Sequence, residues 1–248
     1  MELMRRKGRG IALTDAGARL NVLARECLAA LLDFKHECQA QAVEAAVGAG
    51  ESVIRWLLLP RLEQIRARAP HVRLRLLNLP TNEAVKRLGD GLIDFAVVRK
   101  DAVARPLRAK SLGVMTYALF IPRTLRGVRN QTKGLKVLDG LPLATLEGEG
   151  TFRSTLSALA RKHGARLNVQ VECPSFPLAA RAAAEAKVAA ILPVIAAADL
   201  ETAGFGQVAF PFLKGLDREL CLASSPRLMR IRPALESLVA VLSEVCRF

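Results

Sequence analysis

The sequence predicts an α/β protein that is preceded by a basic hairpin and a long amphipathic helix. From residue 52 onward, helical apolar periodicity alternates with short apolar runs bounded by turn residues, which is typical of a parallel sheet covered by helices. Between residues 20 and 38, apolar residues recur at steps of three and four, which indicates one stripe on a long helix. The chain has 248 residues, of which 51% are hydrophobic, and is long enough for a sizeable core in two lobes.

The first thirteen residues predict a short hairpin. Residues 3–5 form one expected strand and residues 11–13 its return. Gly8 and Gly10 lie between them, where a turn needs positive φ. Four cations cluster on this turn and are expected to contact DNA phosphates: Arg5, Arg6, Lys7 and Arg9.

A long helix is expected to follow, with Thr14 as its N-cap and Asp15 in its first turn. Its apolar stripe consists of Leu20, Leu23, Cys27, Leu31, Phe34 and Cys38. We expect the helix to dimerise through the first five of these residues. Gly48 and Gly50 predict that it ends near residues 47–50, the one plausible domain boundary in the first half of the chain.

This start resembles the wing and linker helix of LysR-type transcriptional regulators. The family pattern Leu-Phe-x-Arg appears as LMRR at residues 3–6, with Met4 in place of Phe, and Leu-Thr-x-x-Gly appears as LTDAG at residues 13–17. In the family a helix-turn-helix precedes this point. The sequence begins at Met1, and we find no recognition helix in it. Specific base readout, which needs a helix in the major groove, is therefore expected to be missing.

The remaining elements follow from periodicity and from turn and cap residues. In the first half we expect a helix over 53–68 capped by Ser52 and closed by Pro70, a strand over 72–78, a helix over 82–88 capped by Thr81, and a strand over 93–98. In the second half we expect strands over 112–121 and within 138–146, a helix from Thr151 or Ser154 to His163, a strand over 167–173, a helix over 176–186 capped by Ser175, strands over 188–192 and 219–224, and a closing helix over 231–245.

Three further motifs strengthen the resemblance in the order that the family has them. They are Leu59-Pro60, Pro70-His71-Val72 and the Leu-x-x-Gly-x-x-Asp pattern of residues 88–94. One motif departs from the family, because residues 187–193 read KVAAILP and lack the usual glycines. The resemblance implies a two-lobed, type 2 periplasmic-binding-protein-like effector domain after a winged-helix remnant and linker helix. The implied division is 1–46 for the wing remnant and dimerisation helix and 47–248 for the effector domain, with lobe I over about 47–117 and 219–248 and lobe II over about 118–218.

The expected effector site lies where strands end and helices begin. In open α/β folds the carboxyl ends of parallel strands face a ligand cleft, and helix N-termini there favour anions. The expected effector-binding residues are Ser52, Thr81, Arg99, Lys100, Gly150, Thr151, Phe152, Ser175 and Pro193. The resemblance implies that Ser52, Thr81 and Arg99 line a pocket between the two lobes. Each Ser or Thr is equally explained as a helix cap alone.

The net charge of +14 is compatible with an anionic ligand, with DNA phosphates or with a solvated basic surface. Residues 1–46 contain 7 Lys and Arg against 6 Asp and Glu. Most of the positive charge therefore lies outside the segment that resembles a DNA-binding part.

The sequence offers little for catalysis or metal binding. Its three histidines are scattered, and no two of its five cysteines have Cys-x-x-Cys spacing. No nucleophile elbow, metalloprotease motif or phosphate-binding loop is found. We therefore expect no catalytic residues, no metal and no cofactor. The apolar runs are too short to span a bilayer, and no apolar segment follows the basic start as in a signal peptide, so we expect a cytoplasmic protein.

The first interpretation is a regulator of the LysR type that senses a small-molecule effector, which we expect to be an organic anion. Its expected partners are DNA in the full-length form, the effector, and further copies in a homodimer or homotetramer, with no membrane. A solute-binding protein of the periplasmic type shares the architecture and remains an alternative. The others are an effector-binding remnant that is defective in DNA binding and an enzyme on the same fold, for which no catalytic constellation is found.

Overall fold

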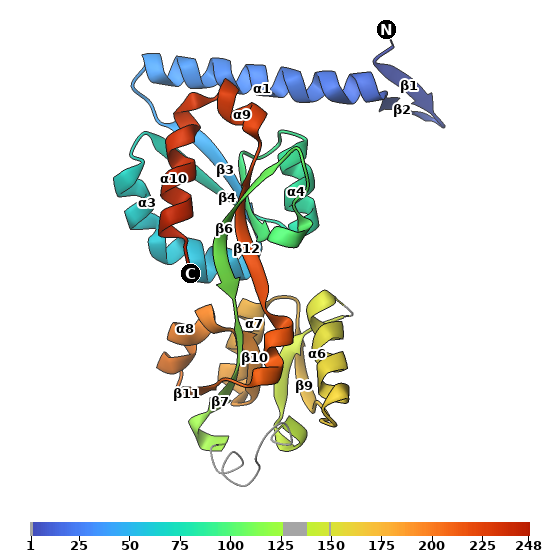
Figure 1. The fold of residues 1–248 in the computed structure, drawn as a ribbon, viewed down its shortest axis with the longest axis vertical. Helices are drawn as coiled ribbons and strands as arrows, with labels where there is room; N and C mark the ends of the chain where they lie inside the picture. The colour runs from blue at the N-terminus through green and yellow to red at the C-terminus, as the bar shows by residue number, and fades with distance from the viewer. Residues whose placement is uncertain (1, 126–137, 149) are drawn as a thin grey trace. The chain divides into compact units, whose positions relative to one another are not determined.

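The computed structural model describes residues 2–125, 138–148 and 150–248 (Figure 1). Its contacts divide the chain into two compact units. The first comprises Met1–Gly50, Arg61–Leu112 and Leu220–Arg247, and the second comprises Glu51–Pro60, Gly113–Glu219 and Phe248. We call the first unit without its hairpin and first helix lobe I, and the second unit lobe II. In the described part of the chain, no helix combines the length and the apolar character needed to cross a membrane.

The predicted hairpin is confirmed. Strands β1 (Met4–Lys7) and β2 (Gly10–Leu13) pair antiparallel, with Lys7 opposite Gly10. The turn between them uses Gly8 with a φ of +62°, whereas Gly10 is the first residue of β2 and its φ is not positive. Only one of the two expected turn glycines therefore requires the left-handed region.

The first helix, α1, spans Asp15–Cys38 and begins as predicted. Its N-cap Thr14 accepts a hydrogen bond from the Gly17 N–H at 3.1 Å through Oγ1. A Cβ atom at Gly17 would lie 1.9 Å from the carbonyl oxygen of Leu3, so this position requires glycine because the helix packs against the backbone of the hairpin.

The predicted end of this helix near residues 47–50 is wrong. The helix ends at Cys38, and the buried strand β3 occupies Val43–Ala49. The small residues that suggested a boundary instead allow close packing, since a Cβ atom at Gly48 would lie 2.7 Å from Cδ1 of Ile93. The expected domain division between residues 46 and 47 falls inside this strand.

Lobe I contains a five-stranded sheet in the order β4-β3-β5-β12-β6. Its other strands are β4 (Val72–Asn78), β5 (Phe95–Arg99), β12 (Arg218–Ser224) and β6 (Arg108–Met115). Strand β3 runs parallel to β4 and β5, and β12 runs antiparallel to β5, so the sheet is mixed rather than purely parallel. Helices α3 (Leu62–Arg68) and α10 (Glu236–Val245) pack together on one side, and α4 (Thr81–Gly89) packs on the other (Figure 1).

Lobe II contains a second five-stranded sheet in the order β11-β7-β10-β8-β9. Its strands are β7 (Tyr117–Pro122), β8 (Leu143–Leu146), β9 (Val169–Cys173), β10 (Ala189–Pro193) and β11 (Phe205–Val208). Strands β8, β9 and β10 are parallel, whereas β7 is antiparallel to both β10 and β11. Its helices are α6 (Thr151–Lys162), α7 (Phe176–Ala186) and α8 (Ala197–Thr202), and its core includes Phe120, Leu192 and Phe205.

Three predicted elements are divided in the structure. The strand expected over 112–121 is two strands, β6 and β7, which belong to different sheets. The helix expected over 53–68 consists of α2 (Glu51–Val53), the π-helical turn η1 (Ile54–Leu58), the 3₁₀ turn η2 (Leu59–Arg61) and α3. The closing helix consists of α9 (Pro226–Ile231), η8 (Pro233–Leu235) and α10. Pro60 and Pro233 lack the N–H group that a continuous α-helix needs at those points.

Four short 3₁₀ turns complete the described elements: η3 (Lys100–Ala102), η4 (Arg123–Leu125), η6 (Val194–Ala196) and η7 (Pro211–Leu216). The turn from α7 into β10, where the family glycines are missing, places Lys187 in the left-handed region with a φ of +53°. A non-glycine residue thus adopts a backbone conformation that favours glycine.

Candidate functional site

The carboxyl edge of the lobe I sheet collects three of the predicted effector-binding residues. Strands β3, β4 and β5 end together, with Ala49 opposite both Asn78 and Val97. Arg99 is the last residue of β5, and Lys100 begins η3 directly after it. Helix α4 begins with Thr81 and packs against both β5 and η3. The topology therefore places this helix start and the two cations at one edge of the sheet.

Thr81 does not have the predicted capping role. Pro80 is the N-cap of α4 and supplies no side-chain hydrogen bond, so Thr81 is the first helical residue. Arg99 is about one-quarter exposed, and its Nε lies 3.7 Å from Oδ1 of Asp101. This ion pair is too long for a hydrogen bond, and the Asp101 side chain is 69% exposed. The guanidinium of Arg99 therefore keeps most of its capacity to bind a carboxylate.

The carboxyl edge of the lobe II sheet collects five more predicted residues. Helix α6 begins after β8 with Gly150 as N-cap and Thr151 as first helical residue, so neither Thr151 nor Ser154 is the cap. Ser175 caps α7 as predicted, and its Oγ accepts a hydrogen bond from the Leu178 N–H at 3.4 Å. Pro193 ends β10 at the same edge, because β8, β9 and β10 run parallel.

An aromatic cluster occupies this edge of lobe II. Phe152 and Phe176 stand at the starts of α6 and α7, and their ring centroids lie 4.7 Å apart in an edge-to-face arrangement. Tyr117, which pairs with Pro193 in the sheet, lies 5.3 Å from Phe152 and 5.8 Å from Phe176. The two Phe side chains are half-buried. Sequence analysis identified Phe152 but missed Tyr117 and Phe176, since no linear spacing connects residues that meet only through the sheet.

Arg153 adds a positive charge next to this cluster. Its Nη2 donates to Oε1 of Glu172 at 3.3 Å, and its side chain is 20% exposed. Its Nη1 is buried and has no hydrogen-bond partner among the described residues, and the same holds for Oγ1 of Thr145 on β8. An unsatisfied buried donor costs free energy, so this guanidinium can gain from an anionic acceptor. Sequence analysis missed Arg153, although its place in the first turn of an expected helix was a usable signal.

A carboxylate also lies close to the aromatic cluster. Asp217 accepts a hydrogen bond from the backbone N–H of Tyr117, which lowers the pKa of its carboxyl group. Burial has the larger and opposite effect, so the pKa of Asp217 is raised above its usual value. The backbone contact directs this carboxylate to the main chain of Tyr117.

Ser52, the remaining predicted effector-binding residue, is not a helix cap. It is the middle residue of the three-residue helix α2, which belongs to lobe II and packs against α7. Ser52 therefore belongs to a different unit from Thr81 and Arg99, which lie in lobe I.

The linker helix α1 attaches to lobe I through buried charges. The most deeply buried residues of α1 are Gly17, Glu26 and Asp33. Asp33 receives two hydrogen bonds from Arg232, from Nε at 2.6 Å and from Nη2 at 2.8 Å. The Nη1 of Arg232 donates to Asp94 at 2.5 Å, and Asp94 also accepts from the Ala46 N–H at 2.7 Å. We call Asp33, Asp94 and Arg232 the arginine cluster.

A second ion pair supports the same face of α1. Glu26, which is 4% exposed, pairs with Arg227 of α9.

Burial raises the pKa of Asp94 in the arginine cluster. The nearby charge of Asp33 acts in the same direction, whereas Arg232 and the Ala46 N–H act to lower this pKa. The sequence did not predict the arginine cluster or the pair of Glu26 and Arg227, because their residues are far apart in the chain.

The predicted dimerisation stripe lies on exposed surface of α1. Leu31 and Phe34 are each 65% exposed, Leu20 and Leu23 are 45% and 44% exposed, and Cys27 is exposed. Leu28 and Leu32 add further exposed apolar area. A contiguous exposed apolar surface of this kind is typical of an interaction site.

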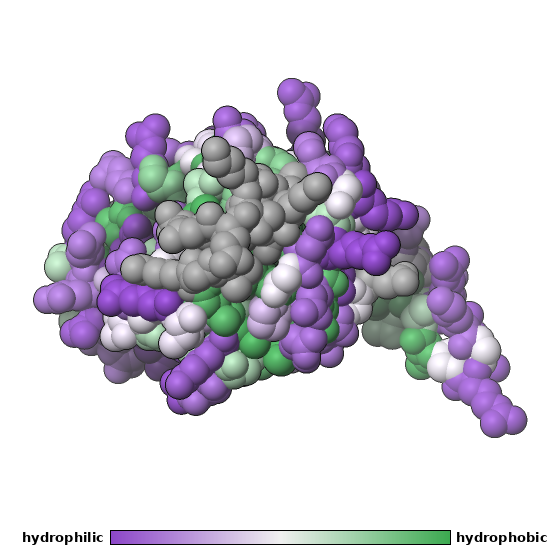
Figure 2. Space-filling model, turned by 90° about the horizontal axis from the view of Figure 1, so that it is seen from below, coloured by the Kyte–Doolittle hydropathy of each residue, from purple (hydrophilic) through white to green (hydrophobic). Residues whose placement is uncertain are grey.

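The hairpin exposes all four predicted DNA-contacting cations: Arg5, Arg6, Lys7 and Arg9. Figure 2 shows the hairpin end of the molecule, at the right of the view, as mainly hydrophilic surface with a hydrophobic patch beside it. Exposure of these side chains is the condition for phosphate contact.

The cysteines and acidic residues form no metal or disulfide site in the described part of the chain. Cys173, Cys221 and Cys246 are buried, and all five cysteines are free. Burial is the main cause that raises the pKa of Cys173, with the charge of Glu147 as the second. Among the described residues, no three His, Cys, Asp or Glu side chains group as metal ligands would.

Comparisons with known proteins agree with this architecture. The family described as LysR substrate binding domain matches residues 41–247. A full-length OxyR variant from Pseudomonas aeruginosa has a TM-score of 0.69 at 18% identity, over 99% of this chain and 80% of that one. CbnR, a LysR family transcriptional regulator, has a TM-score of 0.62 at 22% identity, over 97% of this chain and 84% of that one.

CrgA, a LysR-type transcriptional regulator from Neisseria meningitidis, has a TM-score of 0.66 at 15% identity, over 99% of this chain and 84% of that one. A search of curated proteins finds no significant match. These structural likenesses support the type 2 periplasmic-binding-protein-like fold that was expected. Because the family match extends over nearly the whole chain after α1, the chain belongs to the LysR substrate-binding domain family of transcriptional regulators.

Proposed function

We propose that this chain is the effector-binding and dimerising part of a LysR-type transcriptional regulator, and that its effector is a small organic anion with a flat apolar body. One observation carries this proposal. A half-buried aromatic cluster adjoins the N-terminus of α6, and Arg153 in the first turn of that helix has a buried Nη1 without a partner among the described residues.

Each part of such a ligand has a matching group in lobe II. The N-terminal N–H groups of α6 and the guanidinium of Arg153 suit a carboxylate or phosphate group. Phe152 and Phe176 offer ring faces and edges to a planar body, where aromatic contacts add about 0.5–1.5 kcal/mol beyond area burial. Binding biases the protein toward the conformation that makes these contacts best, which is how a ligand acts on transcription.

The test is a calorimetric screen of small aromatic and aliphatic carboxylates, followed by three variants with the best ligand. We expect Phe152→Ala and Arg153→Gln each to weaken binding about tenfold, equivalent to about 1.4 kcal/mol. Arg161→Gln is the matched control, because Arg161 lies in the last turn of the same helix and is exposed. Equal affinities for Arg153→Gln and the parent would remove Arg153 from the site.

Arg99 is proposed as an effector-binding residue at the carboxyl edge of the lobe I sheet. Removing its side chain in Arg99→Ala should weaken effector binding by about tenfold or more. Calorimetry with the carboxylates of the screen measures this directly. Asp101→Asn is the control, since the long ion pair between Arg99 and the exposed Asp101 contributes little.

DNA binding is also proposed, with the hairpin cations on the phosphates. Each phosphate contact that is removed should reduce the salt dependence of binding by about one unit in the slope of log K against log salt. Lys7→Gln and Arg9→Gln, measured on non-specific duplex DNA with this chain, should flatten that slope. An unchanged slope would show that the hairpin does not touch DNA.

A ligand-recovery measurement separates a binding protein from an enzyme. We expect the effector to be recovered unchanged after long incubation, because neither a regulator nor a solute-binding protein consumes its ligand.

Peroxide sensing through Cys173 is disfavoured, since burial and Glu147 hold the pKa of its thiol above the usual value and thiolates are the reactive form.

A further inference from the structure

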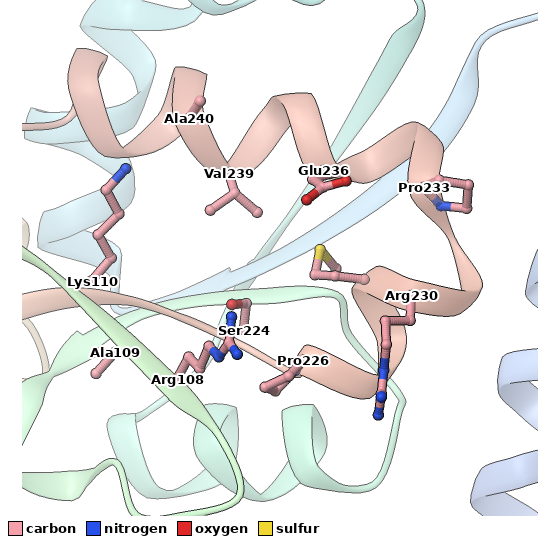
Figure 3. A pocket seen from close by; sticks show the side chains of 11 residues that line it. Arg108, Ala109, Lys110, Ser224, Pro226, Arg230, Pro233, Glu236, Val239 and Ala240 are labelled. Carbon is pink, nitrogen blue, oxygen red and sulfur yellow. The ribbon is translucent and has the colours of Figure 1, made fainter.

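Lobe I contains a groove that none of the effector-binding residues lines. Its walls are the edge strand β6 and helix α10, and the end of β12 and helix α9 form its base (Figure 3). The cavity volume is about 970 Å³. Figure 3 shows Lys110 reaching from β6 toward Ala240 of α10, and the Glu236 carboxylate at the start of the same helix.

The groove carries an excess of positive charge. Arg108, Lys110 and Arg230 line it, all three are exposed, and none forms an ion pair with another described residue. Glu236 is the single carboxylate among the lining residues. Arg68 is the main cause that lowers the pKa of Glu244, which lies further along α10, and the charge of Lys110 adds to this effect. The groove is therefore complementary to a segment that bears several negative charges.

The other edge of the same sheet provides an internal comparison. Strand β4 also carries two cations at alternate positions, Arg73 and Arg75. Both pair with Glu44 of the neighbouring strand, at 2.5 Å and 3.6 Å, and Arg73 lowers the pKa of that carboxyl group. The chain thus pairs the cations of one edge strand with its own carboxylate, whereas Arg108 and Lys110 of β6 form no ion pair within 4 Å among the described residues.

Part of the groove lining is apolar and suits side chains rather than phosphates. Met229 of α9 and Val239 of α10 supply this apolar surface. Ser224 is 8% exposed and lines the groove. A polypeptide that lies along an edge strand places alternate side chains on one face and can meet both kinds of surface.

We propose that this groove binds an extended acidic peptide segment of a partner protein, which adds a strand beside β6 and packs its alternate side chains against α10. Strand β6 is at the end of its sheet, so main-chain pairing is possible on that side. A second copy of this chain is a poor occupant. The net charge is +14, and pairing β6 with itself would bring Arg108 and Lys110 against like charges.

The test is fluorescence anisotropy with a short labelled peptide of alternating aspartate and valine. We expect Arg108→Gln combined with Lys110→Gln to weaken binding about tenfold or more, because each removes a charged contact. The combined variant Arg73→Gln and Arg75→Gln is the matched control and should bind as the parent does. All four side chains are exposed, and circular dichroism confirms that both variants fold.

A second probe separates strand addition from charge attraction. The same peptide with N-methyl groups at alternate residues keeps its charges and loses the donors that would pair with β6. We expect it to bind about tenfold more weakly. Equal binding of the two peptides would overturn the proposal, as would equal binding to the β6 variant and its parent. Tighter binding of duplex DNA, with the same dependence on Arg108 and Lys110, would assign the groove to nucleic acid instead.

Discussion

The two faces of helix α1 differ in a way that reverses the usual distribution of residues. The face that packs on lobe I buries two carboxylates, Glu26 and Asp33, and holds them with arginines. The opposite surface exposes Leu31 and Phe34, each 65% accessible. An isolated helix on a globular protein normally buries its apolar side and exposes its charges.

This difference indicates two kinds of attachment with different purposes. Ion pairs such as that of Asp33 and Arg232 are directional, so they fix the rotation and register of α1 on lobe I at little net gain in stability. Apolar surface is non-directional and contributes free energy whenever it is covered. The inner face thus sets geometry within one chain, and we propose that the outer face supplies the energy for association with another.

The largest expected effect comes from breaking the arginine cluster. Arg232→Met leaves Asp33 and Asp94 buried without their cation, and the loss should be about 3–5 kcal/mol in the free energy of unfolding. Urea unfolding followed by circular dichroism measures it. Arg230→Met, at an exposed position in the same segment, should change stability by less than about 0.5 kcal/mol. A similar loss in both variants would mean that the cluster does not hold α1.

The outer face should determine the oligomeric state. Leu31→Ser combined with Phe34→Ser removes apolar area worth about 1.5–3 kcal/mol for each side chain that becomes buried, and should convert a dimer to a monomer at micromolar concentration. Sedimentation velocity gives the mass. Lys35→Ser is the control on the same helix. A parent protein that is itself monomeric would contradict the proposed role of this stripe.

Thiol labelling provides an independent measurement of the same face. Cys27 and Cys38 are the exposed cysteines of α1, and Cys173, Cys221 and Cys246 are buried. If the stripe pairs with a second copy, labelling of Cys27 should slow as protein concentration rises. Burial raises the pKa of Cys246 to about 11, so this thiol should stay unreactive under the same conditions.

The contrast between the faces also shows what the sequence could and could not predict. The apolar stripe was readable, because residues such as Leu20, Leu31 and Phe34 have helical spacing that does not depend on the rest of the fold. The arginine cluster was not, since Asp33, Asp94 and Arg232 come from distant parts of the chain. Glu26 and Asp33 have the composition of a solvated helix face, and only the tertiary structure shows that they are buried.

The candidate effector site follows the same rule. Arg99, Gly150, Phe152 and Ser175 were predicted from local signals, namely strand ends and helix starts. Tyr117 was missed because it reaches the cluster through antiparallel pairing with Pro193. The helix end was placed too late for a related reason. Residues 43–49 are small and apolar, and periodicity does not separate a short buried strand from the continuation of a helix.

The smallest expected effect is on the pH dependence of the inner face. Burial raises the pKa of Asp94 in the folded protein, so the folded state takes up a proton more readily than the unfolded chain. The contribution of Asp94 to stability is therefore full below the ordinary carboxyl pKa and declines as the pH rises through the raised value. The variant Asp94→Asn should lack this decline. Urea unfolding of the parent and of the variant at several pH values gives the difference between their free energies of unfolding, which should change with pH in the same range.

The outer face predicts the opposite behaviour for association. Leu20, Leu23, Leu31 and Phe34 do not titrate, so the dimerisation constant should stay constant over the pH range in which the contribution of Asp94 changes. Sedimentation at those same pH values tests it. If association and unfolding change together with pH, the two faces of α1 are coupled, and the division between an inner face that sets geometry and an outer face that drives association fails.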